Sequence, residues 1–174
     1  MAADGMGSVL KHFPGYGNNV DTHTGIAVDQ RSLEIFQASD FLPFSAGISA
    51  GDGTTAVLVS HNIITAVDDS LPASLSPVVH DLLRTELGFD GVAMTDDLAM
   101  DAVAAYSEDG AVAVMAIQAG NDLVITTDYR TQIPKAMEAV ENGTLSTETI
   151  DTACRRVLQL SLIHISEPTR HAQI

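Results

Sequence analysis

The sequence predicts an α/β fold built on a parallel sheet, and two features of the chain indicate it. Short apolar runs alternate with amphipathic segments, in a β-loop-α order that occurs four times. The runs are apolar throughout, which is typical of strands that a parallel sheet buries on both faces. Four such units form either an open, doubly wound sheet or half of a (β/α)8 barrel. A complete barrel needs about 250 residues, so these 174 residues would hold only a partial barrel.

Polar residues follow the carboxyl end of every predicted strand. The strands are expected at Gly7–His12, Ala56–Ser60, Gly91–Thr95 and Leu123–Thr126, the first being the end of a buried strand. The polar residues at their ends are Lys11 and His12, Ser60 and His61, Thr95 to Asp97, and Thr126 to Asp128. Parallel α/β folds carry their chemistry at this edge of the sheet, so the sequence predicts a site there.

Helices are predicted between and after these strands, and local signals mark several of their ends. Ser76 is a favoured N-cap residue and Pro77 suits the first helical position. Gly120 is a typical helix stop, and a kink or restart is expected at Pro43. The loop-like segment Phe13–Gln30 is rich in glycine and polar residues. The helices are expected at Ser32–Ala50, Ser76–Leu87, Asp109–Ala119, Thr131–Glu141 and Ser146–Leu160.

Composition excludes several classes of protein. The 23 acidic residues against 8 basic ones give a net charge of −15, which opposes binding to nucleic acid or anionic lipid. Hydrophobic residues make up 45% of the chain and the mean hydropathy is +0.17, which argues against disorder. The single cysteine, Cys154, excludes an internal disulfide and a cysteine-rich zinc site. No run of 18 or more apolar residues is present, so no membrane span is expected.

Both ends of the chain look artificial. From Leu160 the sequence reads LSLIHISEPTR, which resembles the conceptual translation of a transposase adapter used in preparing sequencing libraries. Residues 160–174 are therefore expected not to be native and are excluded from the fold prediction, and residues 1–159 are taken as one partial domain. The N-terminus resembles the end of a helix that leads into a strand and lacks a secretory signal. Whether the protein is cytoplasmic, exported or a lipoprotein depends on sequence before it.

Two motifs carry the chemistry. Residues 11–17 read KHFPGYG and are followed by Asp21-Thr22-His23, and residues 95–100 read TDDLAM. Supporting motifs are LPASLS at 71–76, LRTELGFDG at 83–91 and AGND at 119–122. In this order they resemble the β-N-acetylhexosaminidase branch of the family 3 glycoside hydrolases over about residues 5–158. The resemblance implies the second half of a (β/α)8 barrel, roughly strands 5 to 8 with their helices.

The chain departs from the family pattern at two places in the first motif. The family has a histidine where this sequence has Tyr16, and the spacer Asn18 to Val20 is one residue shorter than in many members. Both departures concern substrate preference more than the class of reaction.

The resemblance implies that Asp96 is the catalytic nucleophile. A retaining glycosidase needs a nucleophile and an acid/base group close together, and the nucleophile forms a glycosyl-enzyme intermediate. Asp96 follows a predicted strand directly, so it lies at the edge where the site is expected. The alternative is that Asp96 or Asp97 caps the following turn; Asp97 is assigned to this structural role.

The acid/base group implied by the resemblance is His23, paired with Asp21. The two residues are two positions apart, so their side chains point the same way in extended backbone. Asp21 can then hold the histidine tautomer, and an imidazole titrates near neutral pH. The alternative is a solvated loop, since Asp-x-His is a common pattern.

Three further residues are expected at the substrate. The resemblance assigns Lys11 and His12 to hydrogen bonds with sugar hydroxyls, although Lys11 could instead form a structural ion pair. His61 either lines the pocket or is a buried histidine with satisfied nitrogens. No compact metal-ligand spacing such as His-x-x-x-His occurs, so no metal or other cofactor is expected.

The sequence thus predicts part of an enzyme that removes terminal β-linked N-acetylglucosamine from small carbohydrates with retention of configuration. Three alternatives stay open: a β-glucosidase of the same family, a phosphorylase that uses phosphate in place of water, and a truncated, inactive piece. Half a barrel exposes unpaired strand edges, so the isolated chain is expected to be insoluble or to form an oligomer.

Overall fold

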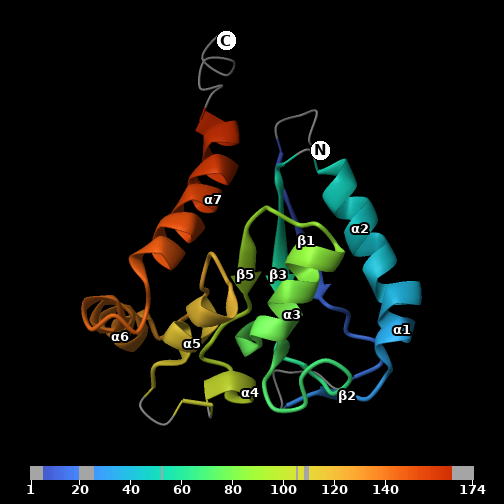
Figure 1. The fold of residues 1–174 in the computed structure, drawn as a ribbon, viewed down its shortest axis with the longest axis horizontal. Coiled ribbons are helices and arrows are strands. Elements are labelled where there is room, and N and C mark those ends of the chain that lie inside the picture. Colours follow the sequence, from blue (N-terminus) through green and yellow to red (C-terminus); the bar gives the residue numbers. More distant parts are fainter. Residues whose placement is uncertain (1–5, 20–25, 52, 105, 108–109, 166–174) are drawn as a thin grey trace.

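The computed structural model describes residues 6–19, 26–51, 53–104, 106–107 and 110–165, and it is an α/β fold with parallel sheets (Figure 1). The main sheet has the strand order β1-β3-β5, with β1 at Ser8–Phe13, β3 at Thr55–Val59 and β5 at Ala93–Thr95. Both strand pairs of this sheet are parallel. Their register places Leu10 opposite Val57 and Val59 opposite Thr95. The three strands lie where the apolar runs predicted them.

The fourth predicted strand is only partly formed. Leu123 makes an isolated parallel bridge with Met94, and its carbonyl accepts the Thr95 N–H at 3.2 Å. The Ile125 N–H then donates to the hydroxyl of Thr95 instead of a backbone carbonyl, which interrupts the ladder. The prediction of a regular strand at 123–126 is therefore wrong, although this segment runs alongside β5.

A second, two-stranded sheet lies in segments for which no strand was predicted. It pairs β2 (Val28–Asp29) with β4 (Ile63–Ile64) in parallel. Two residues are too few to show a period of alternation, so the hydrophobic pattern contained no signal for either strand. Together with β1 and β3, this sheet fixes the backbone just beyond the carboxyl end of the main sheet.

Each of the first two predicted helices contains a π-helical turn. Helix α1 (Leu33–Ile35) passes through such a turn at Phe36–Asp40 into α2 (Phe41–Ala50). The distortion lies one turn ahead of Pro43, whose ring would meet the carbonyl four residues earlier in a regular helix. Helix α3 (Pro77–Asp81) begins at the predicted cap, where Ser76 Oγ accepts the Val79 N–H at 3.4 Å, and continues as a π-helical turn at Leu82–Glu86.

The remaining helices follow β5. They are α4 (Asp101–Ala104), α5 (Val112–Ala119), α6 (Tyr129–Glu141) and α7 (Thr147–Ile165). Helix α5 ends at Gly120, whose φ of 115° is a left-handed conformation that favours glycine. Helix α7 runs five residues past the predicted end at Leu160. Nowhere in the described ranges is a helix both long and apolar enough to cross a membrane.

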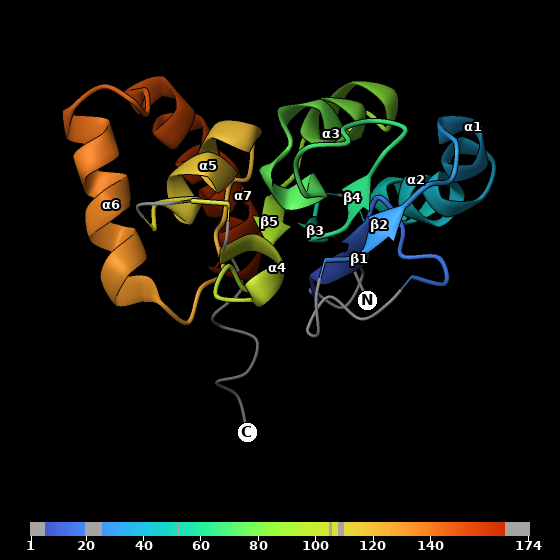
Figure 2. The same cartoon turned by 90° about the horizontal axis from the view of Figure 1, so that it is seen from below.

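Helices α1, α2 and α3 lie on one side of the strands (Figure 2), and side chains from these helices and from the strands form the main buried core. All five phenylalanines of the chain gather there, and the ring of Phe13 packs edge-on against Phe44 with the centroids 5.2 Å apart. The other three are Phe36, Phe41 and Phe89.

The expectation that the first strand is buried needs correction. Phe13 of β1 is buried, but Val9 and Lys11 are exposed, and Val9 has 48% of its surface open. β1 lies at the edge of the sheet and pairs with β3 alone, so among the described residues no neighbouring strand shields its other side.

Candidate active site

The structure brings two of the predicted site residues together at the carboxyl end of the main sheet. His12 lies near the end of β1 and Asp96 directly follows β5. His12 Nε2 is 3.8 Å from Asp96 Oδ2, and the two side chains are 31% and 29% exposed. The pair is thus held by the sheet but is still open to solvent. A carboxylate and an imidazole at this distance can act on one small molecule.

The two oxygens of Asp96 have different surroundings. Oδ1 accepts the backbone N–H of Asp97 at 2.9 Å, which fixes the rotation of the carboxylate. Oδ2 faces His12. Such a carboxylate is oriented by its own turn while its second oxygen can meet a ligand.

Asp97 has the structural role that the sequence predicted for it. Its Oδ1 accepts the N–H groups of Ala99 at 2.9 Å and Thr127 at 3.0 Å. Burial tends to raise the pKa of Asp97, but the hydrogen bonds from Ala99 and Thr127 outweigh it, and the net pKa is lowered. Asp97 therefore joins the turn after β5 to the segment after Ile125.

His61 is a buried histidine with both ring nitrogens engaged. It is 1% exposed, and Nε2 lies 3.1 Å from the carbonyl oxygen of Asp97. A carbonyl only accepts, so Nε2 carries the proton, and Nδ1 accepts from the Ser74 hydroxyl at 2.8 Å. Burial lowers the pKa of His61. This geometry matches the alternative of a satisfied buried histidine, which supports the turn that carries Asp96.

Lys11 is exposed and takes part in none of the ion pairs found among the described residues. The alternative of a structural ion pair for Lys11 therefore has no counterpart in this part of the chain. The predicted acid/base pair, His23 and Asp21, lies outside the described residues.

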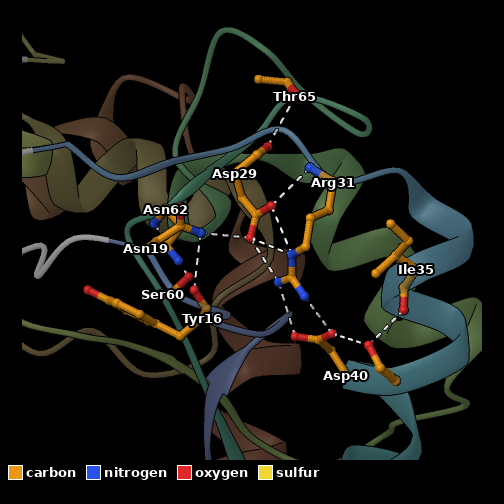
Figure 3. A network of polar contacts seen from close by, with 10 residues as sticks. Tyr16, Asn19, Asp29, Arg31, Ile35, Asp40, Ser60, Asn62 and Thr65 are labelled. Carbon is orange, nitrogen blue, oxygen red and sulfur yellow. Dashed lines mark hydrogen bonds and ion pairs between the residues drawn. The ribbon is translucent and has the colours of Figure 1, made fainter.

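Sequence reasoning missed an ion-pair network beside the site (Figure 3). Arg31 donates to both oxygens of Asp29, with Nη2 2.8 Å from Oδ2, and to Asp40, with Nη1 2.9 Å from Oδ2. Asn19 Nδ2 donates to Asp29 Oδ2 at 2.7 Å and to the Tyr16 carbonyl at 3.1 Å. The spacing of Asp29 and Arg31 was visible in the sequence, but only the fold brings Asp40 and Asn19 to them.

The contacts of this network shift the pKa values of Asp29 and Arg31 so that both stay charged. Burial works to raise the pKa of Asp29, but hydrogen bonds and charge from Arg31 outweigh it and lower the net pKa. Hydrogen bonds to Asp29 raise the pKa of Arg31, so the guanidinium stays charged. The guanidinium also lies over the ring of Phe36, with its carbon 4.3 Å from the ring centroid.

Within the described ranges, no three histidine, cysteine or acidic side chains gather as metal ligands would. The part of the site that is described thus consists of a carboxylate, an imidazole and the polar groups that hold them.

Comparison with known proteins shows the family to which the chain is similar. Residues 1–160 match the family model described as the glycosyl hydrolase family 3 N-terminal domain. A beta-hexosaminidase of Stenotrophomonas maltophilia is 40% identical over 151 residues, which are 84% of this chain and 43% of that protein. A beta-hexosaminidase of Methylococcus capsulatus is 34% identical over 148 residues, covering 84% of this chain and 43% of that protein.

A solved structure shows the same fold. The glycoside hydrolase family 3 beta-N-acetylglucosaminidase from a Paenibacillus species superposes with a TM-score of 0.87 at 33% identity. The match covers 94% of this chain and 32% of that one. The chain thus spans less than half the length of these curated relatives.

Proposed function

Because the chain belongs to glycosyl hydrolase family 3, we propose that it carries the second half of the catalytic barrel of a retaining β-N-acetylhexosaminidase. The observation that carries the proposal is the placement of Asp96. It directly follows β5, one of its oxygens is fixed by its own turn, the other faces His12, and the side chain as a whole is 29% exposed. The similar proteins named as beta-hexosaminidases support the same choice of sugar.

The reaction has two steps in this proposal. In the first, the Asp96 carboxylate attacks the anomeric carbon while His23 gives a proton to the leaving oxygen, so the glycosidic bond breaks and a glycosyl ester forms. In the second, His23 takes a proton from water, the water oxygen attacks the same carbon, and the ester bond to Asp96 breaks. Two displacements on one carbon retain its configuration. Asp21 holds the tautomer of His23 throughout.

The remaining site residues bind the sugar or support the nucleophile. Lys11 and His12 donate to sugar hydroxyls, since both extend from the end of β1 at the same edge as Asp96. His61 acts from behind the site. Its hydrogen bond to the Asp97 carbonyl holds the turn that carries the nucleophile.

The architecture in this proposal is strands 5 to 8 of a (β/α)8 barrel with their helices. The strands β1, β3 and β5 would be strands 5 to 7, and the segment after Asn121, which bridges to β5, would be strand 8. The native part is residues 1–159, and residues 160–174 are an adapter translation. The family match, which stops at residue 160, supports this division.

The complete protein, recovered by reading the gene through both ends of this sequence, would test the nucleophile. We expect Asp96→Asn to lower kcat on nitrophenyl β-N-acetylglucosaminide by about a thousandfold or more, because the intermediate no longer forms. Asp97→Asn is the matched control: its side-chain oxygen can still accept from Ala99 and Thr127, so kcat should stay within about threefold.

Other outcomes of this experiment decide between the alternatives. Full activity in Asp96→Asn would exclude Asp96 as the nucleophile. A preference for nitrophenyl β-glucoside would favour the β-glucosidase alternative, for which Tyr16, in place of the family's histidine, is the residue to examine. If the complete gene adds no further barrel strands, the chain is the inactive, truncated alternative.

A further inference from the structure

We propose that Arg31 is a positioning residue of the active site: it holds the Gly15–Gly17 turn so that Tyr16 keeps the ring of His12 facing Asp96. The inference rests on the proposed function for its effect on catalysis. Its structural part, the link from Arg31 to His12, can be tested separately.

The ion pairs of Arg31 with Asp29 and Asp40 form a clamp. Arg31 is the centre of a network in which its guanidinium meets two carboxylates at 2.8 to 3.1 Å. The Asp29 side chain is only 3% exposed and that of Asp40 is 13% exposed, so the pairs are largely shielded from solvent. The planar guanidinium forms at least two hydrogen bonds to each of the two carboxylates, a geometry that the compact ammonium of a lysine does not reproduce.

The clamp lies close against the Gly15–Gly17 turn. Gly15 has a φ of 137°, and a Cβ added there would lie 2.1 Å from Oδ1 of Asp40. A Cβ on Gly17 would lie 2.9 Å from Nη2 of Arg31. The turn thus lies directly against the two ends of the clamp, and glycine is what allows this approach.

A third contact ties the turn to the same network. Asn19 donates one hydrogen bond to Asp29 and another to the carbonyl of Tyr16. The backbone of Tyr16 is therefore bonded through Asn19 to a carboxylate that Arg31 holds (Figure 3).

Tyr16 connects the turn to His12 and, through His12, to Asp96. The rings of Tyr16 and His12 are in contact, with centroids 5.5 Å apart and planes at 58°. His12 in turn is the imidazole 3.8 Å from Asp96. A shift of the turn would therefore move the wall against which His12 packs, and an error of about 1 Å in a positioned group can cost a hundredfold in rate.

The experiment compares two arginines in the complete protein. Arg156 is the matched control, because it also pairs with two carboxylates and is 24% exposed against 29% for Arg31, but it lies at the opposite end of the sheet. We expect Arg31→Met to lower kcat about tenfold to a hundredfold, while Arg156→Met stays within about twofold. Tm measured on both variants separates this effect from a general loss of stability.

A second readout follows the ring contact itself. In protein labelled at histidine and tyrosine, we expect a nuclear Overhauser effect between the rings of Tyr16 and His12 that is lost in Arg31→Met and kept in Arg156→Met. A further variant, Tyr16→Leu, removes the ring without touching the ion pairs. It should lower kcat in the same way while Tm stays close to that of the unmodified protein.

Three results would overturn the proposal. They are an unchanged ring contact in Arg31→Met, equal losses of kcat in the two arginine variants, and full activity in Tyr16→Leu. If the protein hydrolyses no glycoside at all, the proposed function fails, but the ring contact still decides whether Arg31 positions His12.

Discussion

His61 is a buried side chain whose hydrogen bonds support the turn that carries the proposed nucleophile. Its two ring nitrogens join the Ser74 hydroxyl to the carbonyl of Asp97, next to the proposed nucleophile. Burial keeps its pKa below the usual value, so the ring stays neutral and keeps one donor and one acceptor. The sequence predicted polar residues at this strand end, but it left open whether the His61 ring lines the pocket or is buried with both nitrogens satisfied.

At the residue scale, we predict that His61→Leu lowers the free energy of unfolding by about 1 to 3 kcal/mol, because it leaves a buried hydroxyl and a carbonyl without partners. Urea denaturation measures this. The double variant His61→Leu with Ser74→Ala removes one of the orphaned groups and should lose less than the sum of the two single variants. Simple additivity would show that the two side chains do not interact.

At this scale, sequence patterns predicted which residues share an edge of the sheet. His12 and Asp96 lie at the ends of predicted strands, so their common edge could be inferred from the order of elements. The roles of Asp29, Arg31 and Asp40 could not be inferred, because their pairing depends on how β2 and the turn before α2 fold toward each other. No pattern of period 2 or 3.6 reports such a contact.

At the element scale, Asp122 holds three segments together at the amino end of the sheet. Its oxygens accept from Arg84 at 2.6 Å and from Arg156 of α7 at 3.0 Å. The same carboxylate accepts the N–H of Ala93, the first residue of β5. The side chain is 3% exposed, so these contacts replace its hydration.

We therefore predict that Asp122→Ala destabilises the protein by about 3 to 5 kcal/mol, because two arginines lose a buried partner. The control is Asp90→Ala. Asp90 pairs with Arg156 at 3.2 Å, but its side chain is 95% exposed, and an exposed pair is worth about 1 kcal/mol or less. Urea denaturation compares the two, and equal losses would contradict the proposed role of burial.

Helix boundaries were predicted less well than strand positions. Local signals such as the Ser76 cap and the Gly120 stop are confirmed, because they depend on a few neighbouring residues. The π-helical turns at Phe36–Asp40 and Leu82–Glu86 were missed. Each lies within a segment that the sequence predicted as one continuous helix, so the hydrophobic pattern does not reveal it.

At the scale of the whole molecule, stability should depend on pH through its buried histidines. Burial lowers the pKa of His61 and His80 in the fold, whereas an unfolded histidine has a pKa of about 6.5. The unfolded chain therefore takes up protons below about pH 6.5 that the folded chain does not. We predict that the free energy of unfolding falls between about pH 6.5 and pH 5, with each histidine contributing up to about 1.4 kcal/mol per pH unit.

Urea denaturation at several pH values checks this, and His80→Gln should flatten the dependence. Asp29, Asp68 and Asp97 do not interfere in this range. Their pKa values are lowered in the fold, so the stability they contribute is present above about pH 4 and is lost only as the pH falls further. A flat profile from pH 7 to pH 5 would mean that the fold admits protons to these histidines.

The sequence by itself determined the class of fold, the positions of β1, β3 and β5, the shared edge of His12 and Asp96, and the family through its motifs. These follow from the order of apolar runs and from residues that lie close together in the chain. Only the tertiary structure decided the pairing of β2 with β4, the incomplete fourth strand, the exposed face of β1 and the engaged nitrogens of His61. Each of these depends on which distant segment supplies a hydrogen-bond partner or shields a side chain from solvent. Tertiary packing decides this, and no local sequence pattern reports it.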